Sequence, residues 1–180
     1  MISKFEQRKK AILSKKDKSS IGGWDKKIAK LCDKINKQEN YYTTSSCAGR
    51  IIIMLDQEKK GPGLFEFVGH DLVKELKIPN LKKDLKFKSE PPILHVACRE
   101  LEDAEKLLKK VRDAGWKRSG IISLGKNIIV EIIGTEKLEF PLLEKGKLLV
   151  SKEFLIIVVR KANKNLEKGW DRIDKLREII

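Results

Sequence analysis

The sequence predicts a single α/β domain of the α+β kind, with a mixed or mostly antiparallel sheet and flanking helices. Hairpin signals outnumber strand–helix–strand crossovers along the chain, which disfavours a doubly wound parallel sheet. The glycine-rich loop that opens a Rossmann fold is absent from the sequence. The chain has 180 residues, of which 41% are hydrophobic, and no shift in composition marks a linker. We therefore expect residues 1–180 to form one domain around one core.

The periodicity of the apolar side chains predicts four helices. The first two are expected over residues 2–15 and 24–37. The clearest is expected over residues 100–114, where apolar side chains recur on one face and a glycine follows as a stop signal. The fourth begins near Glu153 and is apolar at first, then amphipathic. Residues 70–76 are expected to form one or two further helical turns.

Short apolar segments between turn residues predict the strands. Gly61-Pro-Gly63 and Gly125-Lys-Asn127 each separate two such segments, so each is expected to close a hairpin. Pro141 and Gly146 indicate a loop. The expected strands are 51–55, 64–68, the surroundings of Phe87, 93–98, 117–123 and 128–133.

Two segments of the chain are faintly similar, Cys47-Ala-Gly-Arg-Ile-Ile52 and Arg118-Ser-Gly-Ile-Ile122. Each places small residues at the start of an apolar strand, which a hairpin partner then follows. An internal duplication and chance both explain similarities as short as these.

The chain carries a formal net charge of +14. One interpretation is a lysine-rich surface that keeps the protein soluble. The interpretation we favour is a polyanionic partner, because each phosphate neutralised by Lys or Arg releases a counterion. A nucleic acid suits this charge better than a membrane surface, since no basic amphipathic helix carries Trp or Phe along its apolar face.

The sequence carries no signal that directs the chain to a membrane. No apolar run reaches the roughly 20 residues that a helix needs to cross a bilayer, and no apolar stretch follows the basic N-terminal residues. The cysteines Cys32, Cys47 and Cys98 are odd in number and widely spaced, which argues against a disulfide framework and a zinc site. We expect a cytoplasmic protein that binds no metal.

The densest polar segment, Tyr42-Thr-Thr-Ser-Ser-Cys-Ala-Gly-Arg50, lies just before an apolar strand. Its small and hydroxyl-bearing side chains let a ligand approach the backbone, and Arg50 offers a fork for a carboxylate or phosphate. A polar strand edge, in which Ser and Thr satisfy backbone groups, explains the same residues equally well. Cys47 is expected to be a packing residue, and His70 and His95, each taken alone, are expected to be core histidines.

Six motifs follow one another in a characteristic order. They are Asp17-x-Ser19-x-x-Gly22-x-x-Asp25, the Tyr42–Arg50 segment, Gly69-His70-Asp71, Glu90-Pro-x-x-Leu-His95-Val, Ala114-Gly-Trp-Lys-Arg-Ser-Gly120 and Glu139-x-Pro141. In this order the chain resembles the tRNA wybutosine-synthesizing protein 3 family over nearly its whole length, and Ser-Ser-Cys-x-Gly-Arg is the most specific part of the resemblance. The departures from the family pattern are Ile21, Ala48 and Gly69, where Lys, Ser and Ser respectively are usual.

The resemblance implies an S-adenosylmethionine-dependent methyltransferase that does not use the Rossmann methyltransferase fold. Its substrate would be phenylalanine tRNA, in which it would methylate N4 of the demethylated wyosine-type base at position 37. Because the methyl donor is an activated sulfonium, the enzyme has mainly to align the methyl group and to accept a proton from the nitrogen.

For this chemistry the resemblance implies three groups of site residues. The candidate proton acceptors, which form the catalytic group, are Asp17, Asp25 and His70. The residues expected to bind the donor are Ser45, Ser46, Arg50 and His95. The residues expected to bind tRNA are Arg8, Lys9, Lys10, Lys117, Arg118 and Ser119.

Two other classes of protein explain the charge without catalysis. A non-catalytic basic RNA-binding module leaves the hydroxyl-rich segment unexplained, and a measurement of S-adenosylmethionine binding separates it from an enzyme. A structural subunit of a larger ribonucleoprotein would show no methylation at all.

Overall fold

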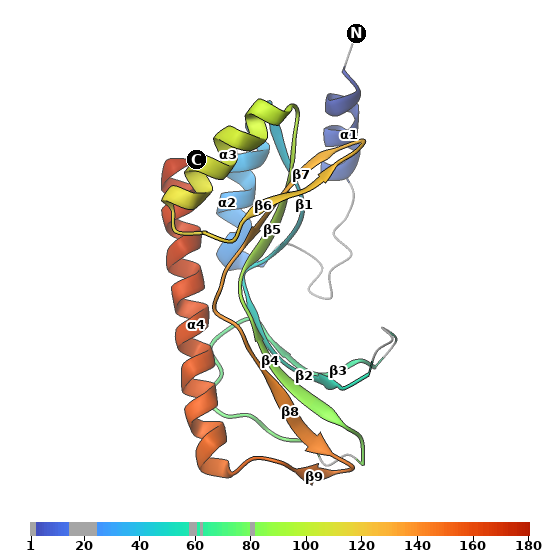
Figure 1. Ribbon diagram of the computed structural model, residues 1–180, viewed down its shortest axis with the longest axis vertical. Coiled ribbons are helices and arrows are strands. Elements are labelled where there is room, and N and C mark those ends of the chain that lie inside the picture. The colour runs from blue at the N-terminus through green and yellow to red at the C-terminus, as the bar shows by residue number, and fades with distance from the viewer. Residues whose placement is uncertain (1–2, 15–24, 58–60, 62, 80–81) are drawn as a thin grey trace. The chain divides into compact units, whose positions relative to one another are not determined.

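The computed structural model describes residues 3–14, 25–57, 61, 63–79 and 82–180 (Figure 1). The helices among these residues are α1 (Lys4–Leu13), α2 (Lys26–Asn36), α3 (Leu101–Asp113) and α4 (Lys152–Ile179). The strands are β1 (Tyr41–Cys47), β2 (Arg50–Leu55), β3 (Phe65–Gly69), β4 (Leu85–Glu90), β5 (Ile93–Cys98), β6 (Gly120–Leu124), β7 (Ile128–Ile133), β8 (Leu138–Glu144) and β9 (Lys147–Leu148).

The strands form two sheets, one in the order β1-β5-β7-β6 and one in the order β3-β2-β4-β8-β9. Within the described residues every pair of neighbouring strands is antiparallel. The predicted α+β class, with an antiparallel sheet and no Rossmann-type arrangement, is therefore confirmed. The hairpin predicted at Gly125-Lys-Asn127 is also present, because β6 and β7 pair on either side of it.

The chain divides into two compact units, each of which draws on both halves of the sequence. Unit 1 comprises Met1–Ala48, Pro92–Thr135 and Trp170–Ile180, and unit 2 comprises Gly49–Pro91 and Glu136–Gly169. The units are therefore not the two halves of a tandem duplication. The prediction of a single domain over residues 1–180 stays a prediction.

In unit 1 the two faces of the four-stranded sheet are covered differently (Figure 1). One face packs Leu94, Val96 and Val130 against buried residues of α2, α3 and the end of α4. On the other face α1 places Phe5 on Tyr42, with ring centroids 5.1 Å apart. The large core of unit 1 thus lies on one side of its sheet, and only α1 packs on the other side among the described helices.

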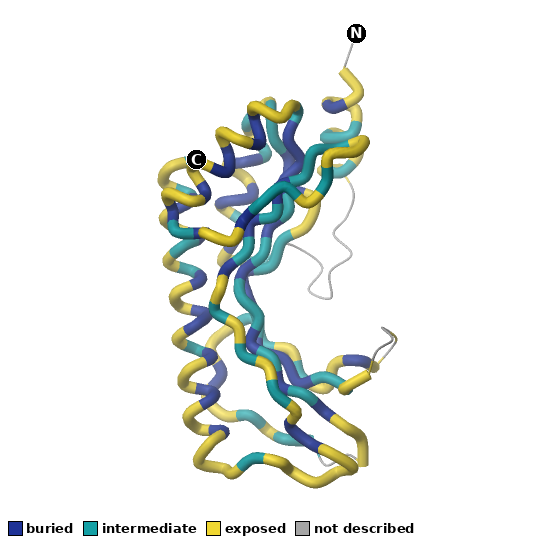
Figure 2. The backbone as a smooth tube through the Cα atoms, in the orientation of Figure 1, coloured by how far each residue is buried: buried dark blue, intermediate teal, exposed yellow. Residues whose placement is uncertain are grey.

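Local sequence explains why the helices of unit 1 begin where they do. Ser3 and Glu6 form a capping box at the start of α1, so the first backbone N–H groups of the helix have acceptors. Asp25 caps α2. In α3 the apolar positions recur at helical spacing and are buried, as the sequence predicts. Figure 2 marks these buried positions in dark blue.

Unit 2 joins its five-stranded sheet to the first part of α4 through apolar side chains. Phe87 of β4 stacks on Phe140 of β8 at 5.0 Å, and Phe140 meets the edge of Phe154 of α4 at 5.4 Å. Offset and edge-to-face pairs of this kind add to the free energy gained from burying the rings. The buried residues of α4 in this unit are Leu155, Val158, Val159, Ala162 and Leu166.

The helical turns predicted over residues 70–76 are wrong, because the structure contains no helix there. The backbone of Val73 bonds instead to the side chain of Asn163 in α4. Its N–H donates to Asn163 Oδ1 at 2.9 Å, and its carbonyl accepts from Asn163 Nδ2 at 2.7 Å. A distant amide thus satisfies the backbone groups that a helix would otherwise pair locally.

The loop predicted from Pro141 and Gly146 is shorter than expected, because Pro141 lies within β8 and only Lys145 and Gly146 form the turn before β9. Strand β9 pairs only with Leu143 and Glu144, so Pro141 stands where β8 has β4 as its single strand neighbour. A proline is tolerated in an edge strand where its nitrogen faces away from the neighbouring strand, because no ladder hydrogen bond is then lost. The strand predicted over 117–123 begins later, at Gly120.

The described residues agree with two predictions from the sequence, one on disulfide bonds and one on membrane-spanning helices. Cys32, Cys47 and Cys98 form no disulfide bond. Burial raises the pKa of the Cys32 and Cys98 thiols to about 12, so these two side chains are neutral packing groups. Within the described residues, no helix has the length and apolar character needed to span a bilayer.

Candidate functional site

A row of three polar side chains crosses the sheet of unit 1. Ser45 of β1 pairs with His95 of β5, and His95 pairs with Glu131 of β7. Ser45 Oγ lies 3.0 Å from His95 Nδ1, and His95 Nε2 lies 2.9 Å from Glu131 Oε2. We call these three residues the Ser45–His95–Glu131 row.

The row lies on the face of the sheet that also carries α1. Tyr42 and Ala97 pair across β1 and β5 and pack against Phe5 of α1. His95 lies two residues before Ala97 on the same strand, so it points to the same side of the sheet. Ser45 is exposed, and the side chains of His95 and Glu131 are 27% and 29% exposed. The row is therefore accessible from solvent.

A β-bulge puts Ser45 into this row. Thr43 pairs with Val96, the next pair is Ser45 with His95, and Thr44 is the extra residue between them. Without the bulge, strict alternation would place Thr44 opposite His95 and turn Ser45 to the other face. Bulges are known to redirect a side chain in this way.

Ser46 points to the opposite face, toward α2. It pairs with Leu94, whose side chain belongs to the main core of unit 1. A hydrogen bond with Ser46 lowers the pKa of the buried Cys32 thiol, against the larger effect of burial. Of the residues predicted to bind the donor, the structure thus brings Ser45 and His95 together and separates Ser46 from them.

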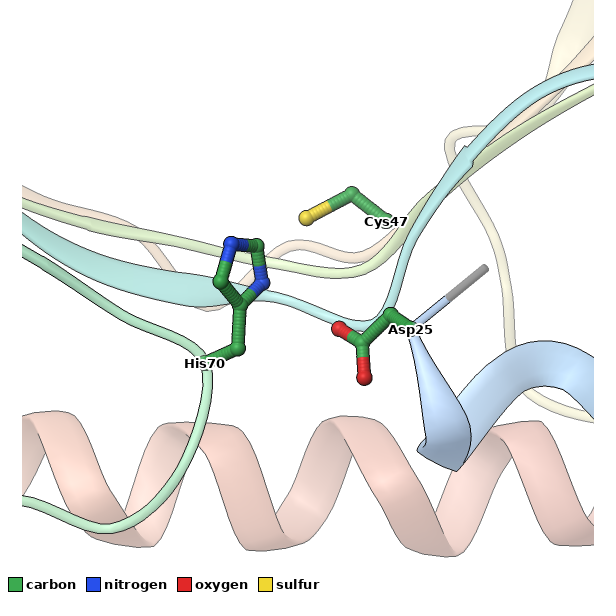
Figure 3. Close-up of side chains that lie close together, drawn as sticks. All are labelled: Asp25, Cys47 and His70. Carbon is green, nitrogen blue, oxygen red and sulfur yellow. The ribbon is translucent and has the colours of Figure 1, made fainter. Parts of the chain in front are cut away.

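Asp25 holds the segment that follows β1. Its Oδ1 accepts from the backbone N–H of Lys27 at 3.3 Å, which caps α2, and its Oδ2 accepts from the backbone N–H of Ala48 at 3.2 Å. Figure 3 shows this carboxylate at the start of α2 and the side chain of Cys47 beside it, with Cys47 Sγ within 4.8 Å of a carboxylate oxygen. Asp25, predicted as a proton acceptor, therefore has a structural role at least.

The carbonyl of Ala48 is held as well. It accepts a hydrogen bond of 3.1 Å from Nε1 of Trp170 in α4, and the ammonium of Lys27 lies 4.3 Å from the centroid of that indole ring. The Ala48 side chain is fully buried in the core of unit 1. Gly49 follows with a φ of 95°, which a residue with a side chain rarely adopts. Both backbone polar groups of Ala48 thus have partners, the N–H in Asp25 and the carbonyl in Trp170.

Arg50 is the first residue of β2 in unit 2, and it forms an ion pair with Glu90 of β4. Its Nε donates to Glu90 Oε2 at 2.6 Å, and its guanidinium lies 5.4 Å from the centroid of the Phe65 ring. The two partners are 31% and 29% exposed. His70, another predicted site residue, follows β3 in the same unit and is drawn in Figure 3. Asp17 lies outside the described residues.

The cations predicted to bind tRNA fall into two groups. Arg8 Nη1 donates to the carbonyl of Lys126 at 2.6 Å, and Lys9 Nζ donates to the carbonyl of Gln38. Both side chains therefore hold α1 to the rest of unit 1. Lys10, Lys117 and Arg118 are exposed. Ser119 is only 5% exposed, and its Oγ accepts from the backbone N–H of Ile133 at 3.2 Å. The RNA contact predicted for Ser119 stays untested.

Unit 2 also contains a groove of about 1150 Å³ between α4 and residues 72–78. Its lining is mainly apolar, with cations from Lys74, Lys152 and Arg160 among others. None of the site residues predicted from the sequence lines it. Its shape and lining follow from the packing of residues far apart in the chain, and the sequence carries no signal for it.

Sequence reasoning also missed Glu131. One signal could have found it, since Glu131 is the single charged residue in the apolar strand Ile128–Ile133, just as His95 is the single polar residue in Ile93–Cys98. A polar side chain inside an apolar strand needs a partner on a neighbouring strand or access to solvent.

Comparison with known proteins identifies a methyltransferase family. A model of the family described as "Methyltransferase TYW3" matches residues 7–180, and the chain therefore belongs to this family. The tRNA wybutosine-synthesizing protein 3 homolog of Xenopus laevis is 38% identical over 98% of this chain and 74% of its own length. The tRNA(Phe) 7-((3-amino-3-carboxypropyl)-4-demethylwyosine(37)-N(4))-methyltransferase of Archaeoglobus fulgidus is 36% identical over 100% of this chain and 93% of its own length.

Solved structures share the fold. The PH1069 protein from Pyrococcus horikoshii has a TM-score of 0.82 at 33% identity, covering 97% of this chain and 92% of its own. A hypothetical protein from Aeropyrum pernix has a TM-score of 0.73 at 25% identity, covering 86% of this chain and 95% of its own. The family that the motifs resemble is thus confirmed by sequence, and the α+β fold by structure.

Proposed function

We propose that this protein transfers a methyl group from S-adenosylmethionine to N4 of the 4-demethylwyosine-type base at position 37 of phenylalanine tRNA. The observation that carries the proposal is the 36% identity, over the whole chain, with the Archaeoglobus fulgidus methyltransferase whose name states this reaction. A Thermococcus sibiricus protein of the same name is 38% identical over 97% of the chain.

The charge of the protein supports a polyanionic substrate. The net charge is +14, and Lys10, Lys117 and Arg118 present exposed side chains in unit 1. Exposed Lys and Arg side chains bind phosphate with little desolvation cost, and the binding weakens as salt rises. Arg8 and Lys9 donate to backbone carbonyls, so we propose for them the weaker role of holding the basic helix α1 in place.

Two of the residues predicted to bind the donor lie where a ligand can reach them. Ser45 and His95 lie 3.0 Å apart on an accessible face, where a hydroxyl and an imidazole can receive a polar group of a ligand. Arg50 offers a guanidinium for a carboxylate, although it is already paired with Glu90. Ser46 pairs with Leu94 on the core side of the sheet, which fits donor binding poorly. When bound, the donor supplies an activated methyl group.

We further propose that the protein works in the cytoplasm. Its three cysteines form no disulfide bond, as expected in a reducing compartment, and its tRNA substrate would be found there. We also propose that units 1 and 2 act as one methyltransferase domain, since the family match runs through both.

The reaction is tested with the purified protein, S-adenosylmethionine and tRNA from cells that lack this enzyme. We expect mass spectrometry of the digested nucleosides to show one added methyl group on the demethylated base at position 37. Phenylalanine tRNA with an unmodified guanosine at that position is the matched control, because it offers the same phosphates without the tricyclic acceptor base. Tight binding of both tRNAs without methyl transfer would instead favour a non-catalytic RNA-binding module.

A further inference from the structure

We propose that the Ser45–His95–Glu131 row is the proton relay of the methyl-transfer reaction, with Ser45 Oγ as the atom that receives the proton from the substrate nitrogen. This inference rests on the proposed function and assigns the proton acceptor within it. It gives Ser45 and His95 a role other than the donor binding expected from the sequence, and it adds Glu131.

The direction of the hydrogen bonds supports a relay. A carboxylate only accepts, so in the 2.9 Å contact Nε2 of His95 carries the proton and Glu131 Oε2 receives the bond. In the neutral imidazole Nδ1 is then an acceptor, and the hydroxyl of Ser45, 3.0 Å away, donates to it. The lone pairs of Ser45 Oγ are left to face a ligand. The same order of groups occurs in serine hydrolases, where the proton passes from the hydroxyl to the imidazole and the carboxylate stabilises the imidazolium.

The relay balances the proposed reaction. The donor's bond from sulfur to the methyl carbon breaks, a bond from the acceptor nitrogen to that carbon forms, and the donor leaves as a neutral thioether. The N–H bond breaks and its electron pair stays on nitrogen. The proton goes to Ser45 Oγ while the Ser45 proton passes to His95 Nδ1. Glu131 stabilises the resulting imidazolium, which later loses its extra proton to water.

Other groups in unit 1 are less suited to this task. Both carboxylate oxygens of Asp25 accept backbone hydrogen bonds. The thiols of Cys32 and Cys98 are buried, and burial raises the pKa of each to about 12. The row, by contrast, is exposed at Ser45 and partly exposed at the other two residues.

Three charged groups of α1, the helix packed on this face, are bonded elsewhere. On α1, Glu6 bonds to Ser3 and lies 3.9 Å from Arg99, which follows β5. Arg8 and Lys9 donate to the carbonyls described above. Gly120 of β6 pairs with Glu131 and leaves open space beside it. Glu131 is thus the charged group that acts on His95 directly.

The test measures methyl transfer by the full-length protein across a pH series. We expect His95→Gln to lower kcat by about 10² to 10⁴-fold, as removal of a general base does, with an unchanged donor Kd by calorimetry and a similar Tm. Ser45→Ala should lower kcat with the same unchanged Kd. The matched controls are Glu105→Gln, an exposed acid of α3, and Ser123→Ala, in the β6–β7 hairpin; both should keep the parental rate.

Glu131→Gln gives a readout that a merely structural role would not move. Because Glu131 stabilises the imidazolium that forms during the reaction, Glu131→Gln should lower kcat and leave the donor Kd and the Tm unchanged. This variant and Ser45→Ala also keep the inference testable if His95→Gln fails to fold.

The outcomes separate the two proposals. Absence of methyl transfer by the parent protein overturns the proposed function and the relay with it. Methyl transfer by the parent and by a well-folded His95→Gln variant, with the same kcat and pH profile, overturns the relay alone. A raised donor Kd that accounts for the whole loss of rate in His95→Gln also overturns the relay, in favour of donor binding by His95.

Discussion

The carboxylate of Asp25 accepts a hydrogen bond of 3.2 Å from the backbone N–H of Ala48, twenty-three residues further along the chain. The same side chain caps α2 through the backbone N–H of Lys27. One residue thus fixes both the start of a helix and the end of the Ser-Ser-Cys-Ala motif, whose carbonyl at Ala48 is held by Trp170.

Replacement of Asp25 tests this double role. We expect Asp25→Ala to lower the free energy of unfolding by about 1 to 2 kcal/mol, because it removes a helix cap and leaves the N–H of the buried Ala48 without its acceptor. Asp25→Asn keeps one acceptor oxygen and should cost less. Urea unfolding at neutral pH measures both. A large loss of methyl transfer in a fully stable Asp25→Asn protein would show instead that the carboxylate acts in the reaction.

Arg50 is expected to bind the donor in addition to pairing with Glu90. Arg50→Ala should raise the donor Kd by about tenfold, as loss of a charge-assisted bond does, and lower the free energy of unfolding by at most about 1 kcal/mol, since the pair is partly exposed. Calorimetry and urea unfolding measure the two effects. Glu90→Gln is the control, because it releases the guanidinium from its partner and should not weaken donor binding. An unchanged donor Kd in Arg50→Ala would leave Arg50 a purely structural role.

The exposed pair Lys117 and Arg118 is expected to bind phosphate groups of the tRNA. The double variant Lys117→Ala/Arg118→Ala should raise the tRNA Kd and lower the slope of log Kd against log salt by about two, one for each phosphate that is no longer neutralised. The donor Kd should not change. Lys106→Ala/Lys109→Ala, which removes the same charge from α3, controls for net charge. Equal weakening by both double variants would mean that Lys117 and Arg118 bind no particular phosphate.

Glu139 is expected to make the free energy of unfolding depend on pH in the acidic range. Hydrogen bonds from Lys137 and then Lys88, each 2.8 Å, lower the pKa of Glu139 from 4.5 to about 2. A lowered carboxyl pKa means that the stabilisation is complete above pH 4.5 and is lost as the pH falls toward 2. The loss should be about 1 kcal/mol or less, because the carboxylate is 34% exposed.

Urea unfolding of Glu139→Gln checks this dependence. The variant should be less stable than the parent at neutral pH, and the difference should shrink as the pH falls through this range. Glu144→Gln, an exposed acid on the same strand, is the matched control. A constant difference between parent and Glu139→Gln from neutral pH down to about pH 2 would contradict the assigned pKa shift.

The sequence by itself determined the elements that depend on neighbouring residues. The helix α3 follows from apolar residues three and four positions apart, and the β6–β7 hairpin from a glycine-containing turn between two apolar segments. The absence of a Rossmann-type fold follows from a missing local motif. The family also follows from motif order, because the residue types and their spacing are present in the chain before it folds.

Only the tertiary structure decided which polar side chains meet. The bulge at Thr44 turns Ser45 toward His95, and the register of β5 and β7 brings Glu131 to the same imidazole. Asn163 bonds to both backbone groups of Val73 in a segment that forms no helix, and the short β9 leaves Pro141 at an edge position of β8. These contacts join residues far apart in the chain, 36 residues for His95 and Glu131 and 90 for Val73 and Asn163, or depend on a shift of one residue in strand register. Local propensity carries no information on either, since both are set by the packing of distant segments.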